Sequence, residues 1–210
     1  EDLIPTGPRI STNDGAKAQN RTYQDLLKNK NDEKNFEILA LSELYKVSIK
    51  GSKRLWKKSD MYRNINFSPD GRFVLITTIK RPFSYLVPYY RFPTLYTIFE
   101  GTGKQVAILA DIPLIEDLPK GFMSVRKGAR NFSWRLDKPA SIFFVSALDD
   151  GDPQIESEFR DELFQLNAPF NADPISLLKT KNRFYRSSWC NDTLAIVSDY
   201  WWNNRNAKTY

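Results

Sequence analysis

A short phrase that recurs three times constrains the fold of this chain more than any other feature of the sequence. Each copy places an aromatic residue three positions before an aspartate, a turn residue after the aspartate, and then a run rich in β-forming residues. The three pairs are Phe67 and Asp70, Trp134 and Asp137, and Trp189 and Asp192. An internal repeat of strand, turn and strand is typical of the blades of a β-propeller.

Simple physical chemistry predicts a role for each part of the phrase. The aromatic residue ends one strand on the buried face, and the aspartate closes a tight turn by accepting backbone N–H groups. The apolar strand that follows packs between neighbouring blades. Because the copies lie farther apart than the ~40–45 residues of a minimal blade, the blades must carry insertions, which we place at residues 81–94 and 110–130.

The remaining pattern agrees with an all-β fold built from antiparallel blades of a partial β-propeller. From residue 43 the apolar residues alternate with period two, and residues 44–57 have the pattern of a hairpin. In the polar lead-in of residues 1–42, Asn31 or Asp32 is expected to cap a short helix. Three blade-like units are predicted at approximately 43–110, 111–180 and 181–210, the last continuing beyond the chain. A β-sandwich or a solenoid is the alternative.

Several classes of function are excluded or disfavoured by what the chain lacks. It contains no histidine, so it holds neither a Ser-His-Asp triad nor the commonest zinc ligand, and we expect no catalytic residue, metal or cofactor. The 31 basic residues are interleaved with 25 acidic ones, which argues against a nucleic-acid partner. No apolar run approaches the roughly 20 residues of a membrane span. The single cysteine, Cys190, is interpreted as a small apolar residue.

Longer strings carry a resemblance to a known family. The string FSPDGRFV at residues 67–74 looks like the blade motif of prolyl oligopeptidase-type propellers. The more specific strings are RPFSYLVPYYRFP at 81–93, LPKGF at 118–122, GARNFSWR at 128–135 and DYWWN at 199–203. Together they resemble the glutamyl endopeptidase and dipeptidyl aminopeptidase branch of that family, found in Bacteroides-like bacteria and in chloroplasts. The resemblance covers most of residues 4–210.

The resemblance implies a function that the chain performs only with other parts of a larger protein. In that family a propeller caps an α/β-hydrolase domain that carries a Ser-Asp-His triad, and that domain is missing here. The chain is therefore interpreted as a non-catalytic propeller fragment of a serine peptidase that gates and helps to recognise peptide substrates. The expected location is the periplasm, or outside the cell, of a Gram-negative bacterium. A stand-alone protein-binding module is the main alternative, and a polysaccharide-binding domain using Trp56, Trp201 and Trp202 is a third.

The insertion at residues 81–93 supplies the candidate substrate-binding residues, which are Arg81, Tyr85 and Arg91. Its prolines stiffen the loop, and arginine offers a charged fork that suits a carboxylate. The family resemblance implies a preference for peptides with acidic side chains, which fits such a fork. The alternative is that the loop only covers the edge of a blade.

Overall fold

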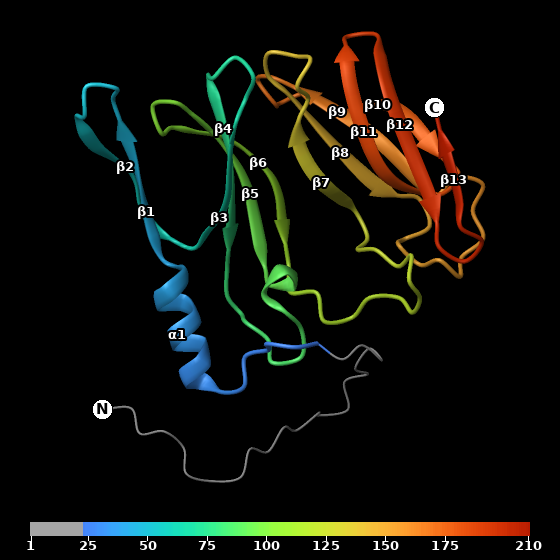
Figure 1. Cartoon of the computed structure of the whole chain (residues 1–210), viewed down its shortest axis with the longest axis horizontal. Coiled ribbons are helices and arrows are strands. Elements are labelled where there is room, and N and C mark those ends of the chain that lie inside the picture. Colours follow the sequence, from blue (N-terminus) through green and yellow to red (C-terminus); the bar gives the residue numbers. More distant parts are fainter. Residues whose placement is uncertain (1–22) are drawn as a thin grey trace. The chain divides into compact units, whose positions relative to one another are not determined.

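A computed structural model describes residues 23–210, and it confirms the predicted all-β class (Figure 1). Strands make up 47% of the described residues and helices 7%, and these strands form four antiparallel sheets without a closed barrel. This architecture is consistent with a partial propeller-like fold. The long connections at residues 80–93 and 113–128 coincide with the two predicted insertions.

Each sheet is built from strands that follow one another in the chain. The two-stranded sheet pairs β1 (Ser42–Val47) with β2 (Lys53–Asp60). The first four-stranded sheet has the order β3 (Tyr62–Phe67), β4 (Phe73–Ile79), β5 (Thr94–Glu100) and β6 (Gln105–Ile112). The second has the order β10 (Ile175–Thr180), β9 (Asp161–Asn167), β8 (Ser141–Ala147) and β7 (Ala129–Trp134). The last sheet is β11 (Arg183–Asn191), β12 (Leu194–Trp201) and β13 (Asn206–Thr209). The unit predicted over 43–110 thus contains two separate sheets.

The helix predicted in the lead-in segment is present, but its cap lies earlier than expected. Helix α1 spans Lys30–Ala40, and the side chain of Asn29 accepts hydrogen bonds from the backbone N–H groups of Asn31 and Asp32. The cap is therefore Asn29, because its side chain reaches the first unpaired N–H groups of the helix. A single 3-10 turn, η1 (Tyr89–Arg91), is the other helical element of the described residues.

The chain divides into two compact units, and the first is built around an aromatic core. Its described residues are 23–64, 77–96 and 111–117. The buried core is Met61, Ile79, Phe83, Val87 and Phe92. Phe36 of α1 meets the rings of Phe83 and Phe92 edge-on, at centroid distances of 5.1 and 5.6 Å. Such edge-to-face contacts are favourable, so the helix is fastened onto the insertion loop.

The second unit comprises residues 65–76, 97–110 and 118–210. Its core lies between the β7–β10 sheet and the β11–β13 sheet, where Phe143, Val145, Leu163 and Val197 are buried together. All four come from strands β8, β9 and β12; β8 and β12 carry continuous apolar runs, and along β9 buried positions alternate with half-buried ones. Two adjacent sheets therefore share one apolar layer, as sheets that pack face to face do.

The repeated aromatic residues differ in burial. Trp134 is 6% exposed and donates its indole N–H to the carbonyl of Asn66. Trp189 is half-buried and packs against the ring of Phe143 at 5.4 Å. Phe67 is 66% exposed, so the prediction of a buried position is wrong for this copy.

The repeated aspartates also differ, because only the first closes its turn as predicted. Asp70 accepts the backbone N–H of Arg72 at 3.0 Å. Asp137 is instead held by the guanidinium of Arg135, which forms two hydrogen bonds to its carboxylate. Asp192 is exposed, and the asparagine that precedes it accepts the N–H that closes the turn. An arginine partner does not by itself explain the difference, because Asp70 also accepts a hydrogen bond from the guanidinium of Arg72 at 2.8 Å.

Candidate functional site

The loop of residues 81–93 holds Arg81 against helix α1. The guanidinium of Arg81 binds both carboxylate oxygens of Glu37, at 3.1 and 2.6 Å, and reaches Glu33 at 3.3 Å. The hydrogen bonds from Arg81 hold the pKa of Glu37 below its ordinary value, and those to Glu37 raise the pKa of Arg81. Two carboxylates thus surround one cation, and this small cluster carries a net negative charge.

The other two predicted residues lie in different surroundings. Tyr85 is 39% exposed, and partial burial together with a hydrogen bond to Glu33 raises the pKa of its phenol. Arg91 is 6% exposed on η1, with its guanidinium over the ring of Tyr23 at 5.3 Å. Arg81 and Tyr85 therefore meet at Glu33, whereas Arg91 is enclosed. Substrate binding by the three residues stays a prediction.

An arginine–aspartate cluster in the second unit was not anticipated from the sequence. Arg183 bridges Asp149 at 2.7 Å and Asp161 at 3.1 Å. Arg160 binds Asp149 at 2.8 Å, and Arg130 binds Asp161. Both carboxylates are 0% exposed. Burial lowers the pKa of Arg130, and the charge of Asp161 opposes that shift.

The cluster is satisfied by backbone groups as well as by ion pairs. Arg183 also donates to the carbonyls of Met123 and Arg160, at 2.9 and 3.0 Å. The backbone N–H of Phe184 donates to Asp161 at 2.7 Å. Buried charges persist only when they are paired and hydrogen-bonded in this way. The cluster therefore fastens β11 to the start of β9 and to the loop that precedes β7.

The sequence offered little sign of this cluster. The run Asp-Asp-Gly-Asp at residues 149–152 has the composition of an exposed turn. Asp150 and Gly151, at φ +53° and +83°, both adopt the left-handed conformation, and of the two only the glycine is a sign that the sequence carries. The loop at Val125 packs directly against Gly151. A side chain at position 151 would prevent this contact, because its Cβ would overlap the carbonyl of Val125. Burial of the aspartates depends on contacts far away in the chain.

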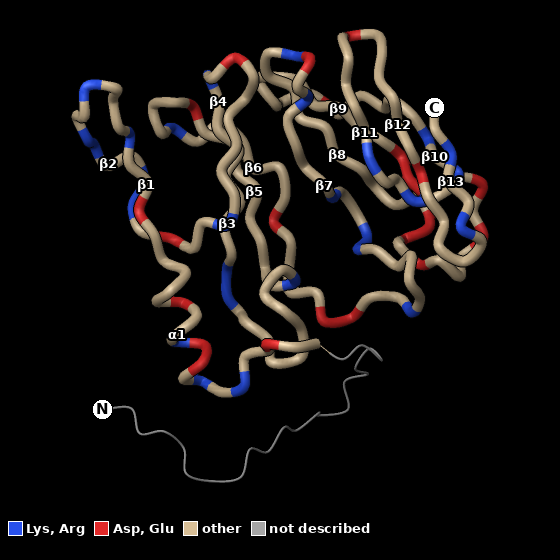
Figure 2. Tube along the Cα trace, in the orientation of Figure 1, with Lys and Arg blue, Asp and Glu red and all other residues tan. Residues whose placement is uncertain are grey.

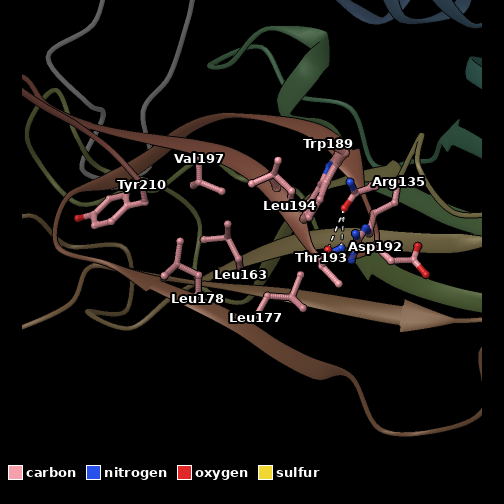
Figure 3. A pocket seen from close by; sticks show the side chains of 12 residues that line it. Arg135, Leu163, Leu177, Leu178, Trp189, Asp192, Thr193, Leu194, Val197 and Tyr210 are labelled. Carbon is pink, nitrogen blue, oxygen red and sulfur yellow. Dashed lines mark hydrogen bonds between the residues drawn. The ribbon is translucent and has the colours of Figure 1, made fainter.

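A cavity of about 270 Å³ lies between the β7–β10 sheet and the β11–β13 sheet (Figure 3). Leu163, Leu177 and Leu178 line one part, and Trp189 stands at the other end beside Arg135. An apolar cavity with a few polar groups at one end is the usual form of a binding site for an apolar side chain.

Arg135 shapes the polar end of this cavity without being free to bind a ligand. Its guanidinium stacks over the ring of Trp189 at 3.9 Å and is hydrogen-bonded to Asp137 and Gln165. The hydrogen bonds from Arg135 hold the pKa of Asp137 below its ordinary value. Arg135 is 3% exposed. The cavity offers apolar contact and contains no pair of nucleophile and base.

The paired tryptophans of the third alternative already have partners. Arg160 lies over the ring of Trp201 at 4.7 Å, and Arg205 lies over Trp202 at 3.6 Å. Phe122 contacts the ring of Trp202 at 5.2 Å. Both tryptophans therefore have cations on their rings. Stacking of a sugar would have to compete with these contacts.

Neither a metal centre nor a membrane helix is found in the part of the chain that the structure describes. No group of three His, Cys, Asp or Glu residues within 23–210 could hold a metal ion. No helix of that part is long and apolar enough to cross a membrane.

The fold and these sites define an all-β chain of antiparallel sheets without a catalytic histidine. It is 38% identical over 210 residues to a protein of Oryza sativa subsp. japonica named probable glutamyl endopeptidase, chloroplastic. It is 36% identical over 211 residues to a protein of the same name from Arabidopsis thaliana. Each alignment covers 99% of this chain and 22% of the relative, so the chain spans about a fifth of the relatives' length.

These relatives support a link to peptidases and leave the finer assignments as predictions. No family model matches the chain, and no solved structure matches it. The prolyl oligopeptidase family, the dipeptidyl aminopeptidase branch and a bacterial source therefore remain predictions, and both relatives are plant proteins. The periplasmic or exported location likewise remains a prediction.

Proposed function

We propose that this chain is the non-catalytic, propeller-like part of a larger serine peptidase that cleaves peptides at glutamate. An α/β-hydrolase domain elsewhere in the full-length protein supplies the catalytic triad. The observation that carries the proposal is the match along 99% of the chain to only 22% of proteins named glutamyl endopeptidase. The absence of histidine from the chain agrees with it, because the triad must come from elsewhere.

The proposed role is to restrict access to the catalytic site and to contact the peptide. A wall of antiparallel sheets admits short or unfolded peptides and excludes folded proteins. The exposed apolar residues support a place within a larger fold, since Leu194 and Ile196 of β12 are each 56% exposed. Phe67 of β3 is similarly uncovered. Large exposed apolar surface usually marks an interface.

Peptidase activity is expected in the full-length protein and not in residues 1–210. The chain lacks a histidine and a nucleophile elbow, so it cannot form the Ser-Asp-His triad of the proposed hydrolase domain. The measurement is hydrolysis of chromogenic peptides with glutamate before the scissile bond, by both forms at equal concentration. Turnover that co-purifies with residues 1–210 and persists after serine-hydrolase inhibitors would contradict the proposal. A reading frame without a hydrolase domain would favour the stand-alone binding module.

We assign the contact with the substrate carboxylate to Arg81, assisted by Tyr85, while the enclosed Arg91 stays within the loop that carries both. Arg81 is the accessible cation of the three, with 48% of its side chain exposed. In the full-length enzyme, Arg81→Gln is expected to lower kcat/KM for a glutamate peptide about tenfold relative to its glutamine analogue, the low end for a lost charge-assisted contact. Glu33 and Glu37 keep the effect at this low end because they share the guanidinium.

The matched control for this prediction is Arg54→Gln, which removes an exposed arginine of the same unit that lies outside the loop of residues 81–93. It should leave the ratio of the two substrates unchanged. A ratio that is also unchanged in Arg81→Gln, with a lowered melting temperature, would assign Arg81 to fastening α1 alone.

A further inference from the structure

The β1–β2 hairpin is the smallest sheet of the described structure and has unpaired edges on both strands. Its two strands pair with each other and with no other strand of residues 23–210. No side chain of either strand is fully buried. A two-stranded hairpin is at best marginally stable in water, and further strands or packing against a helix are needed for independent stability. A further strand on an open edge of the hairpin would meet this need.

One face of the hairpin carries apolar side chains that the described structure leaves largely exposed. Tyr45 stands opposite Leu55, and Val47 lies two residues further along the same strand, on the same face. These side chains are 41%, 41% and 65% exposed, in that order. Apolar residues beside open strand edges promote association with another strand. A β-strand that pairs with an open edge of the hairpin would also cover part of this apolar face.

The charge of the hairpin defines the chemistry of that partner. Residues 42–60 contain six Lys or Arg residues and two acids, a net charge of +4 in a chain whose total is +6. Figure 2 shows basic residues along both strands and in the turn that joins them. Lys53 lies over the ring of Tyr45 at 3.9 Å, so a cation stands directly on the apolar face. A complementary strand must carry acidic side chains.

The alternative occupants fit less well. Residues 1–22 contain three acids and three bases, so they provide no net negative charge. A second copy would bring another hairpin of the same charge, which repels the first. A lipid surface would attract the cations but would not supply the backbone hydrogen bonds that open edges require. The chain spans 22% of the length of its relatives, so most of a full-length protein of that size lies outside these residues.

We propose that an acidic β-strand from the part of the full-length protein outside residues 1–210 pairs with an edge of the β1–β2 hairpin and covers Tyr45, Val47 and Leu55. This strand completes the sheet through backbone hydrogen bonds and places carboxylates against the hairpin's lysines and Arg54. The proposal does not depend on peptidase activity.

Hydrogen exchange tests the pairing in the full-length protein. Backbone amides of residues 42–60 should exchange at least about a hundredfold more slowly in the full-length protein than in residues 1–210, because paired amides exchange only on local opening. The double variant Lys53→Glu with Lys58→Glu should remove most of this protection. The control, Lys104→Glu with Lys120→Glu, makes the same charge change at two exposed lysines and should retain it. Equal exchange in the two proteins would overturn the proposal.

A carbodiimide, which joins lysine to a carboxylate only when the two touch, identifies the occupant. Cross-links from Lys53 or Lys58 should lead to Asp or Glu beyond residues 1–210 within one polypeptide. Cross-links only between two molecules, or only to Glu1, Asp2 or Asp14, would refute the assignment. If the full-length protein lacks peptidase activity but shows the protection and these cross-links, the proposed function fails and the third strand stands. If the full-length protein has peptidase activity but shows neither the protection nor these cross-links, the proposed function stands and the third strand is refuted.

Discussion

Replacement of Arg183 by methionine is expected to lower the free energy of unfolding by about 3–5 kcal/mol, the range for breaking a buried ion pair by removing one partner. Arg183 is 3% exposed and binds two carboxylates that are both fully buried. Methionine keeps much of the apolar volume of the side chain, so the main change is the loss of charge and hydrogen bonds. Asp149 and Asp161 would each retain a single arginine partner.

The measurement is urea unfolding of the chain, followed by tryptophan fluorescence. Arg186→Met is the matched control, because Arg186 lies in the same strand, β11, and is exposed. Surface substitutions of this kind usually change stability by less than about 0.5 kcal/mol. Equal destabilisation by the two variants would show that the arginine–aspartate cluster contributes nothing particular. A stable Arg183→Met protein would show that apolar packing can replace the cluster.

Substitution of Gly151 by alanine is expected to be the second most damaging change, because two costs add. Residue 151 has φ +83°, a left-handed conformation that costs a residue with a Cβ about 1–2 kcal/mol. The new Cβ would also overlap the carbonyl of Val125, and overpacking typically costs about 1–3 kcal/mol. That overlap would separate two loops joined by a hydrogen bond from the N–H of Val125 to the carbonyl of Gly151 at 3.0 Å.

Gly71→Ala separates these two costs. Gly71 also has a positive φ, of +71°, but a Cβ there would meet nothing within 4 Å. Only the backbone cost of about 1–2 kcal/mol applies to this variant. The difference between the two variants in urea unfolding therefore measures the overlap at Val125. If both lose the same stability, the loops adjust without cost and the close approach is not required.

The strands were predictable because their signals are local. The β-rich apolar runs of β4, β8 and β12 are bounded by turn residues that lie next to them in the sequence. The burial of the repeated aromatics was less predictable. Phe67 and Trp134 occupy the same place in the repeat, yet one is exposed and the other buried. Their burial depends on which sheet lies beside them.

The candidate sites were less predictable than the strands. The sequence identified Arg81, Tyr85 and Arg91 from the composition of one loop. Composition could not indicate that Arg81 binds Glu33 and Glu37, which precede it by more than forty residues. The arginine–aspartate cluster gave no local signal at all, because Asp149 and Arg183 are 34 residues apart. Contacts of this kind depend on how the sheets pack.

The sequence alone determined that this protein is an antiparallel all-β chain with neither a histidine nor a nucleophile elbow of its own. Periodicity, turn residues and composition are properties of short segments, so they can be recognised in the sequence without the tertiary structure. Only the tertiary structure decided which charges are buried. The free energy of a buried carboxylate depends on the partners that surround it, and for Asp149 and Asp161 those partners include an arginine from a different sheet.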